Sequence, residues 1–203
     1  MTTVILGVSV ALLIAFQIYT TMSTAQTATQ AYKVIRTEKD FEIRFYPVVT
    51  MATITSSATT YKDLGSSGFR KLAGYIFGGN SSKQKIAMTA PVHMDINDSA
   101  SSMSFVMPAE YYKDNLPIPN DSGVEIKNST EEFVAAIRFG GFASGERIKK
   151  YEEKLSELLK KYKLIHYGNF RFLGYNPPYQ LFGRRNEIIV TINWDSKKSL
   201  LIP

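Results

Sequence analysis

The sequence predicts an α+β domain with a strongly curved sheet or open barrel, two helices packed outside it, and an additional apolar helix at the N-terminus. Three observations indicate this class. The first 32 residues carry no charge and begin with a long apolar run, short runs rich in β-branched and aromatic residues have the length of strands, and two longer segments have helical spacing. The helical segments lie about 85 residues apart, each between strand-like runs in the same order, which we interpret as a duplicated β-β-α-β-β unit.

The N-terminal segment is the first predicted element. Val4 to Tyr19 is almost entirely apolar, and the first charged side chain is Lys33. A helix that crosses a bilayer needs about 20 apolar residues, with a lower limit near 17, so the run is of marginal length. Because the basic start of an export signal is missing, we expect an uncleaved anchor. Small residues from Ser23 to Ala28 leave a cleaved signal, and therefore a periplasmic or secreted protein, as the alternative, with a buried helix as the third.

The chain is thereby divided into three parts. We predict a membrane anchor or signal over residues 1–20, a flexible linker over the Thr-, Ala- and Gln-rich residues 21–31, and one folded domain over residues 32–203. The orientation in a membrane is not readable, because Lys and Arg flank the apolar run on its C-terminal side alone.

The first repeat unit is predicted to contain a glycine-rich helix from Thr60 to Phe77. Thr60 followed by Asp63 resembles a capping box at its start. Three internal glycines each weaken such a helix by up to about 1 kcal/mol relative to alanine, so tight packing or a ligand close to the backbone is expected to compensate. The strands expected in this unit are 41–45, 48–55, 85–95 and 103–107, and the strand 32–36 is expected before it.

The second repeat unit is predicted to contain a helix from Glu146 to Lys163, with an apolar stripe on one face and lysines and glutamates opposite. This pattern indicates a scaffold helix that covers a sheet. The strands expected in this unit are 124–127, 132–139, 169–175 and 187–193.

Several kinds of chemistry are excluded or disfavoured by the residue types. The chain has no cysteine, which excludes disulfides, thiolate metal sites, cysteine nucleophiles and a lipoprotein anchor. It has two histidines at no metal-binding spacing, no nucleophile elbow and no phosphate-binding loop. The net charge of +6 is spread along the chain without a nucleic-acid-binding pattern, and it would suit anionic lipid headgroups or a porphyrin with its propionates. A binding protein is therefore favoured over an enzyme.

Two segments carry candidate binding residues. On the first helix, apolar side chains could line a groove or simply belong to the core: Phe69, Leu72, Ala73 and Ile76. The loop from Tyr175 to Tyr179 contains two prolines that stiffen it. Arg184 and Arg185 follow, and adjacent strand residues point to opposite faces. One of them could pair with Glu187 or another carboxylate inside the fold, while the other faces solvent or a ligand acid.

Two motifs in the folded part resemble a known family. The run Lys85–Val92 (KIAMTAPV) and the run Gly174–Pro178 (GYNPP) leading into Arg184–Glu187 (RRNE) resemble the signatures of the SOUL heme-binding family. Supporting pieces occur in family order from about Tyr32 to Asn193, which is nearly the whole predicted domain.

The resemblance implies a distorted antiparallel β-barrel made from two similar halves, with heme or free porphyrin as a non-covalent ligand. The implied role is transport, storage or buffering of tetrapyrroles. The implied site is an apolar groove between the first helix and the C-terminal loop. Carried over by position, its residues are Phe69, Leu72, Ala73 and Ile76 on the helix, and Pro177, Pro178, Tyr179 and Gln180 on the loop. Arg184, or alternatively Arg70 or Lys71, could supply the basic group for a propionate.

This chain departs from the family pattern at several of these positions. Gly74 and Gln180 stand where relatives can have lysine, and Ala73 is smaller than the methionine of some members. His93 is the first candidate for an axial heme ligand and His166 the second, although neither clearly occupies the histidine position of other members. The duplicated architecture also resembles effector-binding domains of bacterial regulators, so another amphipathic small molecule is the alternative ligand. An enzyme acting on tetrapyrroles is a third alternative.

Overall fold

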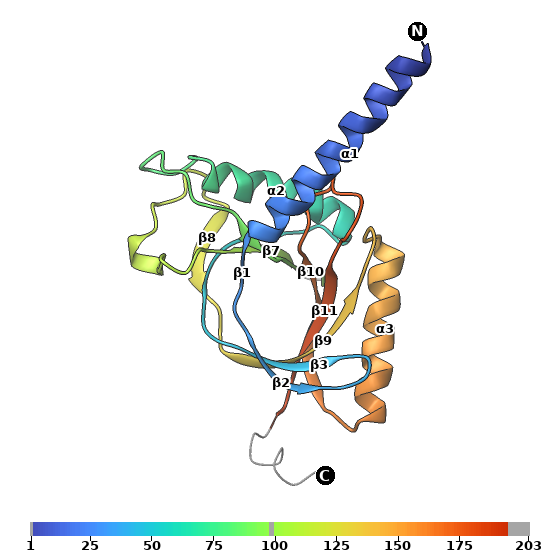
Figure 1. Cartoon of the computed structure of the whole chain (residues 1–203). Helices are drawn as coiled ribbons and strands as arrows, with labels where there is room; N and C mark the ends of the chain where they lie inside the picture. Colours follow the sequence, from blue (N-terminus) through green and yellow to red (C-terminus); the bar gives the residue numbers. More distant parts are fainter. Residues whose placement is uncertain (1, 98–99, 195–203) are drawn as a thin grey trace.

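The computed structural model describes residues 2–97 and 100–194, so residues 98–99 and 195–203 of the predicted domain lie outside the described part (Figure 1). Its α-helices are α1 (Thr2–Gln26), α2 (Tyr61–Ile76) and α3 (Gly145–Lys161), with a short 3-10 helix η1 (Lys113–Asn115). The predictions of α2 and α3 are therefore confirmed to within two residues at each end.

The strands agree closely with the predicted runs, except that the long run 85–95 forms strand only in its second half. They are β1 (Ala28–Thr29), β2 (Lys33–Thr37), β3 (Glu42–Tyr46), β4 (Thr50–Ser56), β5 (Thr89–Ala90), β6 (Val92–Asp95), β7 (Ser101–Val106), β8 (Val124–Asn128), β9 (Glu132–Phe139), β10 (His166–Gly174) and β11 (Asn186–Ile192). All strands except β1 and β5 form one antiparallel, nine-stranded sheet in the order β2-β3-β9-β11-β10-β6-β7-β4-β8. β1 and β5 form a separate parallel pair.

The strand order of the sheet has the symmetry expected of a duplicated unit. From the centre, where β10 pairs with β6, the sequence β10-β11-β9-β3 on one side matches β6-β7-β4-β8 on the other. In each half the outermost of these strands comes from the other repeat unit, since β3 pairs with β9 and β8 pairs with β4. The two units are thus interleaved, and neither has a complete sheet without the other.

The sheet is strongly curved, as predicted, but it is not closed, so the barrel implied by the resemblance is not formed. Figure 1 shows the strands bending around a central space, with β2 at one edge and β8 at the other. Among the described residues no ladder joins β2 to β8. Most side chains of these two strands are exposed or half-buried, as is usual for edge strands.

The helices α2 and α3 cover the outer face of the sheet, where the main hydrophobic core lies. α2 packs on β4 and β7, and α3 packs on β9 and β11. Fully buried residues such as Ile43, Leu72 and Leu155 belong to this core. The inner face carries a smaller apolar cluster that includes Tyr46, Leu173 and Tyr175. The sheet therefore has one apolar face and one face that mixes apolar and charged side chains.

Local interactions explain where the two outer helices begin and how α2 tolerates its glycines. The hydroxyl of Thr60 accepts a hydrogen bond from the Asp63 N–H (3.1 Å), and Ser144 does the same for Arg147 (3.3 Å). A Cβ at Gly68 would lie 3.0 Å from the Ile54 Cδ1 atom. Close packing of α2 on β4, rather than a ligand, therefore accounts for the glycine at this position.

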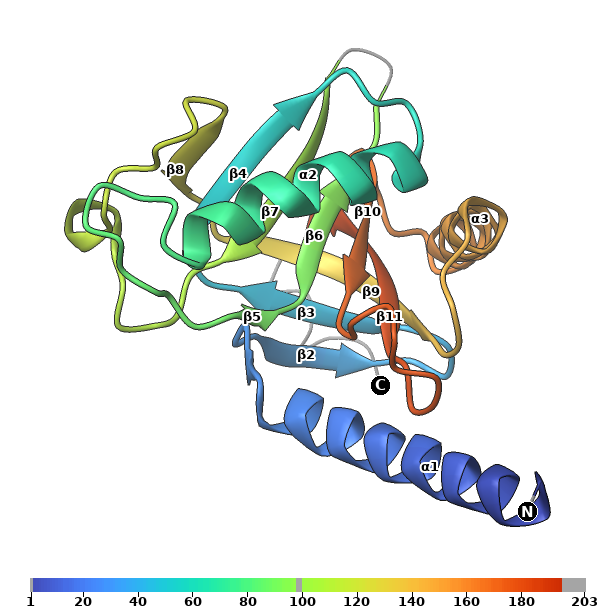
Figure 2. The ribbon, with the colours of Figure 1, turned by 90° about the horizontal axis from the view of Figure 1, so that it is seen from above.

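Helix α1 projects away from the domain at its N-terminal end (Figures 1 and 2). Its apolar side chains, from Ile5 to Met22, are mostly exposed, and Ile5–Gln26 is long and apolar enough to cross a membrane. Residues 21–26 of the predicted linker continue this helix, and Ala28–Thr29 then pairs with Thr89–Ala90. The last turns of α1 are thus joined to the domain by regular structure.

Candidate functional site

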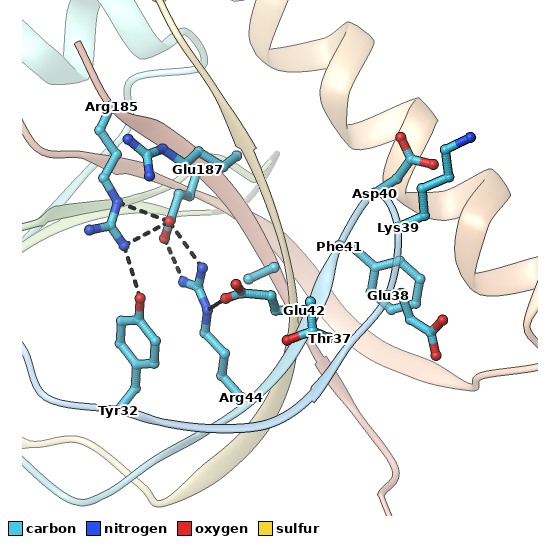
Figure 3. Close-up of a pocket in the computed structure, with 12 residues that line it drawn as sticks. Tyr32, Thr37, Glu38, Lys39, Asp40, Phe41, Glu42, Arg44, Arg185 and Glu187 are labelled. Carbon is cyan, nitrogen blue, oxygen red and sulfur yellow. Dashed lines mark hydrogen bonds and ion pairs between the residues drawn. The ribbon is translucent and has the colours of Figure 1, made fainter. Parts of the chain in front are cut away.

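The inner face of the sheet holds a buried carboxylate between two arginines. The Glu187 side chain, on β11, is fully buried. Arg44, on β3, donates two hydrogen bonds to it, from Nη1 to Oε2 (2.7 Å) and from Nη2 to Oε1 (3.1 Å). Arg185 donates from Nε and Nη2 to Oε1, at 3.0 and 2.8 Å. Figure 3 shows both guanidinium groups directed at this one carboxylate.

Three tyrosines complete this group, which we call the Glu187 cluster (Glu187, Arg44, Arg185, Tyr32, Tyr46 and Tyr175). The Tyr175 hydroxyl donates to Glu187 Oε2 (2.9 Å), and the Tyr32 hydroxyl accepts from Arg185 Nη2 (3.1 Å). The Arg44 guanidinium lies 4.3 Å from the centre of the Tyr32 ring, and that of Arg185 lies 3.9 Å from the centre of the Tyr175 ring. Both arginines are therefore held by cation–π contacts as well as by charge.

The electrostatics of the cluster favour its charged state. Burial alone would raise the pKa of Glu187, but the hydrogen bonds and charge of Arg44, together with the charge of Arg185, outweigh it and hold the pKa below the usual value. Burial, followed by the nearby Glu187 charge, raises the pKa of Tyr175, so its hydroxyl stays protonated. The cluster is therefore a fully paired ionic network that joins the β2–β3 hairpin to the central strand β11.

A cavity of about 320 Å³ opens beside the cluster. Its other wall is the turn between β2 and β3, including Glu38, Lys39 and Asp40 (Figure 3). Binding pockets for flat organic ligands are lined mostly by apolar side chains, whereas this cavity is lined mostly by charged ones. Two of its arginines, Arg44 and Arg185, already bind the Glu187 carboxylate. The cavity suits a small polar molecule better than the ring of a tetrapyrrole.

A second cavity, of about 210 Å³, lies on the same face and contains His93 of β6. The His93 Nε2 atom is 2.7 Å from the amide oxygen of Gln30, so Nε2 carries the proton and donates. Burial, and then the charge of Arg171, lowers the pKa of His93 to about 3, and the ring is neutral near neutral pH. Axial ligation through Nε2 would require this hydrogen bond to be given up, and that role stays a prediction.

His166 occupies a different environment at the beginning of β10. Its ring lies 5.2 Å from the ring of Phe170. Its Nδ1 atom is buried and has no hydrogen-bond partner among the described residues. It lies at the opposite end of β10 from the C-terminal loop. Its role as a heme ligand also stays a prediction.

The predicted groove residues on α2 lie mostly inside the core. Leu72 and Ile76 are fully buried and Ala73 is buried, whereas Phe69 is 39% exposed and packs edge-on against Phe105 (5.3 Å between ring centres). A ligand on this helix would meet Phe69 at the surface, and it would reach Leu72 or Ile76 only if α2 moved away from the sheet.

The predicted loop residues lie together in the β10–β11 loop (residues 175–185). Tyr179 is exposed, and it contacts the ring of Phe16 on α1 (6.0 Å between ring centres). Gln180 is buried and accepts a hydrogen bond from the Thr24 hydroxyl of α1 (2.7 Å). Arg184 donates from Nη1 to the carbonyls of Pro177 (2.6 Å) and Gln180 (2.7 Å). The structure thus gives Arg184 a role in holding the loop, and its Nε atom is buried without a hydrogen-bond partner among the described residues.

The two predicted parts of the groove are not neighbours in the structure. Figure 2 shows α2 on the outer side of the sheet, and the β10–β11 loop on the far side, next to α1. Among the described residues, neither hydrogen bonds nor ring contacts join α2 to this loop. A tetrapyrrole could therefore contact one of the two surfaces, at Phe69 or at Tyr179, without touching the other.

Some residues of these sites were not singled out from the sequence. Arg44 was missed, although its signal was present: with strand periodicity, Glu42, Arg44 and Tyr46 point to one face of β3. Gln17 of α1 was also missed, although it interrupts an apolar run. The expectation for the two adjacent arginines is partly confirmed, because Arg185 pairs with Glu187.

Comparisons with known proteins agree with the two motifs. The family model described as SOUL heme-binding protein matches residues 27–191. Heme-binding protein 2 of Mus musculus is 31% identical over 156 residues, which cover 73% of this chain and 76% of that protein. Heme-binding protein 1 of Xenopus laevis is 27% identical over 161 residues, which cover 74% of this chain and 84% of that protein. Among solved structures, the C-terminal domain of EcmrR has the same fold, with a TM-score of 0.60 at 6% identity, covering 76% of this chain and 98% of that one. The chain belongs to the SOUL heme-binding family.

Proposed function

We propose that this protein binds heme or a related tetrapyrrole non-covalently, for transport, storage or buffering rather than for turnover. The observation that carries the proposal is the family match over residues 27–191, which includes both motif regions and all of the described sheet except the last residue of β11. The two relatives named above are heme-binding proteins by name.

The surface most suited to a flat apolar ring is the outer side of the β10–β11 loop. Tyr179 and Phe182 are exposed there, and Phe142 is exposed beside them, with the Arg184 guanidinium 4.5 Å from the centre of its ring. Exposed aromatic side chains favour stacking with a porphyrin, because both partners are flat and apolar. The α2 surface offers Phe69 as an exposed aromatic side chain, with Arg70 and Lys71 next to it in the chain. Cations at such a position would pair with propionates.

The proposal can be tested by titrating the full chain, in detergent micelles, with hemin while the Soret band is followed. Saturation at one heme per chain is expected. The variants Tyr179→Asp and Phe69→Asp place a charge on the two candidate surfaces without removing a core side chain. The one that lies in the site is expected to weaken hemin binding about tenfold or more, which corresponds to roughly 1.4 kcal/mol.

The matched control is Ile165→Asp. Ile165 is as exposed as the residues tested, and it precedes β10 at the end opposite to the loop. Its hemin affinity is expected to equal that of the unmodified chain. A response that does not saturate would overturn the proposal and favour a different amphipathic ligand. Saturation with the same affinity in all four proteins would exclude both candidate surfaces.

A further inference from the structure

The β10–β11 loop has an unusual distribution of polarity, because its apolar side chains point outward. Tyr179, Leu181 and Phe182 are 56%, 49% and 70% exposed. The polar side chain between them, Gln180, is 1% exposed. In water, the opposite arrangement would be the more stable one.

The backbone of the same loop is largely hydrogen-bonded within the protein. Arg184 donates to the carbonyls of Asn176, Pro177 and Gln180. Gln180 donates from Nε2 to the carbonyl of Phe182 (2.8 Å). The Leu181 N–H donates to the side chain of Gln17 (2.8 Å). A segment with outward apolar side chains and internally paired backbone groups meets the requirement for contact with lipid, where water is not present to pair them.

Helix α1 supplies part of this pairing. The Gln17 side chain bridges two loop groups, because its Nε2 donates to the Tyr179 carbonyl (3.1 Å) and its Oε1 accepts from the Leu181 N–H. The Thr24 hydroxyl adds its bond to Gln180. Two polar positions of this largely apolar helix are therefore matched to polar groups of the loop. A signal peptide that is removed has no need of such matching, so these contacts favour retention of α1.

The length of α1 places the loop at the level of the membrane surface. Ile5–Ala15, the part that precedes the first loop contact at Phe16, is roughly 17 Å long at 1.5 Å per residue. A hydrocarbon core of about 30 Å is crossed only if the span includes the turns that contact the loop. The whole candidate span, Ile5–Gln26, has 22 residues and satisfies this requirement.

We infer that the β10–β11 loop inserts its apolar side chains into the bilayer interface beside α1, so that the domain is held against the membrane in one orientation. Tyr19, which is 70% exposed on α1, and Tyr179 on the loop are suited to this layer, where tyrosine rings are enriched. The inference gives the exposed loop side chains to lipid, and in the membrane-bound protein it therefore leaves Phe69 on α2 as the exposed aromatic candidate for contact with a tetrapyrrole.

The experiment uses the full chain reconstituted in phosphatidylcholine vesicles, with tryptophan fluorescence as the readout. The single natural tryptophan is first replaced (Trp194→Phe), and a new one is introduced by Phe182→Trp in one protein and Ile165→Trp in another. These two positions are matched in exposure, at 70% and 72%. They lie beyond opposite ends of β10, which is about 30 Å long.

Phosphatidylcholine brominated on its acyl chains is expected to quench the tryptophan at 182 several-fold more than the one at 165. Acrylamide, which quenches from water, is expected to show the reverse order. Equal quenching of the two positions, or no quenching of either by bromolipid while the protein floats with the vesicles, would overturn the inference. Failure of the full chain to float with the vesicles would also overturn it, because α1 would then not be an anchor. Hemin titration in detergent of the protein with Ile165→Trp, whose substitution lies in neither candidate surface, reports on tetrapyrrole binding separately.

Discussion

Arg184 and Arg185 are adjacent in the chain, yet they belong to two regions of opposite character. Arg185 lies in the Glu187 cluster, where charged groups are buried and the polar side chains pair with one another. Arg184 lies in the β10–β11 loop, where apolar side chains are exposed and the backbone carbonyls accept hydrogen bonds from side chains of the protein. In both regions the polarity is the reverse of the usual one, and in both it is tolerated because the polar groups have hydrogen-bond partners. The comparison teaches that pairing, rather than position, decides which polar groups a fold can keep from water.

The largest effect is expected from breaking the inner region. Glu187→Ala leaves two arginines buried with their main partner removed, which should lower the free energy of unfolding by about 3–5 kcal/mol. Chemical denaturation of the full chain in detergent would measure it. Glu42→Gln is the matched control, because Glu42 also binds Arg44 (2.7 Å) but is partly exposed. Its cost should be below about 1 kcal/mol. Similar costs for the two variants would show that burial does not set the strength of the network.

The second effect concerns the pH dependence of the same face. His93 has a pKa of about 3 in the folded protein, against 6.5 ordinarily. Between these values the unfolded chain binds a proton that the folded protein does not, so the stability falls as the pH is lowered from 6.5 towards 3. The slope from this residue is about 1.4 kcal/mol per pH unit, and it vanishes above 6.5.

The pH dependence is measured from unfolding curves between pH 7 and 4.5. His93→Gln should remove most of this slope, whereas His166→Gln serves as the control and should retain it. A slope that is unchanged in His93→Gln would mean that carboxylates alone account for the loss of stability in acid.

The third effect concerns the outer region. Gln17→Leu keeps α1 apolar but removes the partners of the Tyr179 carbonyl and the Leu181 N–H. Each lost bond should cost about 1 kcal/mol locally, so amide hydrogen exchange at Leu181 should become roughly 5–30-fold faster. Gln26→Leu is the control, since Gln26 is exposed at the end of α1, and it should leave the exchange unchanged. Unchanged exchange in Gln17→Leu would show that the loop does not depend on the helix.

The smallest effect is expected for the exposed side chains of the loop. Phe182→Ser should change the free energy of unfolding by no more than about 0.5 kcal/mol, because this side chain lies outside the core. Leu72→Ala, at a position also predicted to line the groove, should cost about 2–5 kcal/mol. Thermal unfolding of both variants distinguishes a surface position from a core position. Comparable costs would contradict the packing described for one of them.

Much of the architecture could be predicted because it depends on local patterns. The apolar stripe of α3, the capping pair Thr60 and Asp63, and the apolar run within β9 are properties of neighbouring residues, and the structure confirms these elements. The open edges at β2 and β8 were not predictable in this way. Closure of a sheet depends on how far curvature brings its two edges together, and no local pattern determines that distance.

The candidate site could be predicted in part. The sequence identified the β10–β11 loop and the possibility that an arginine pairs with Glu187, since both features depend on residues that are close together in the chain. It did not identify Arg44 as the second partner, because 143 positions separate Arg44 from Glu187. Nor did it determine whether Leu72 and Ile76 belong to the core or to a ligand groove, since an apolar helical stripe has the same pattern in both cases.

The sequence by itself determined the family, the order of the strands and helices, the duplicated unit and the apolar N-terminal helix, because motifs, periodicity and length are local quantities. Only the tertiary structure decided which strands pair across the two units, that α2 and the β10–β11 loop lie on different sides of the sheet, and that Gln17 contacts the loop. These facts depend on contacts between residues far apart in the chain, which chain topology and side-chain packing bring together.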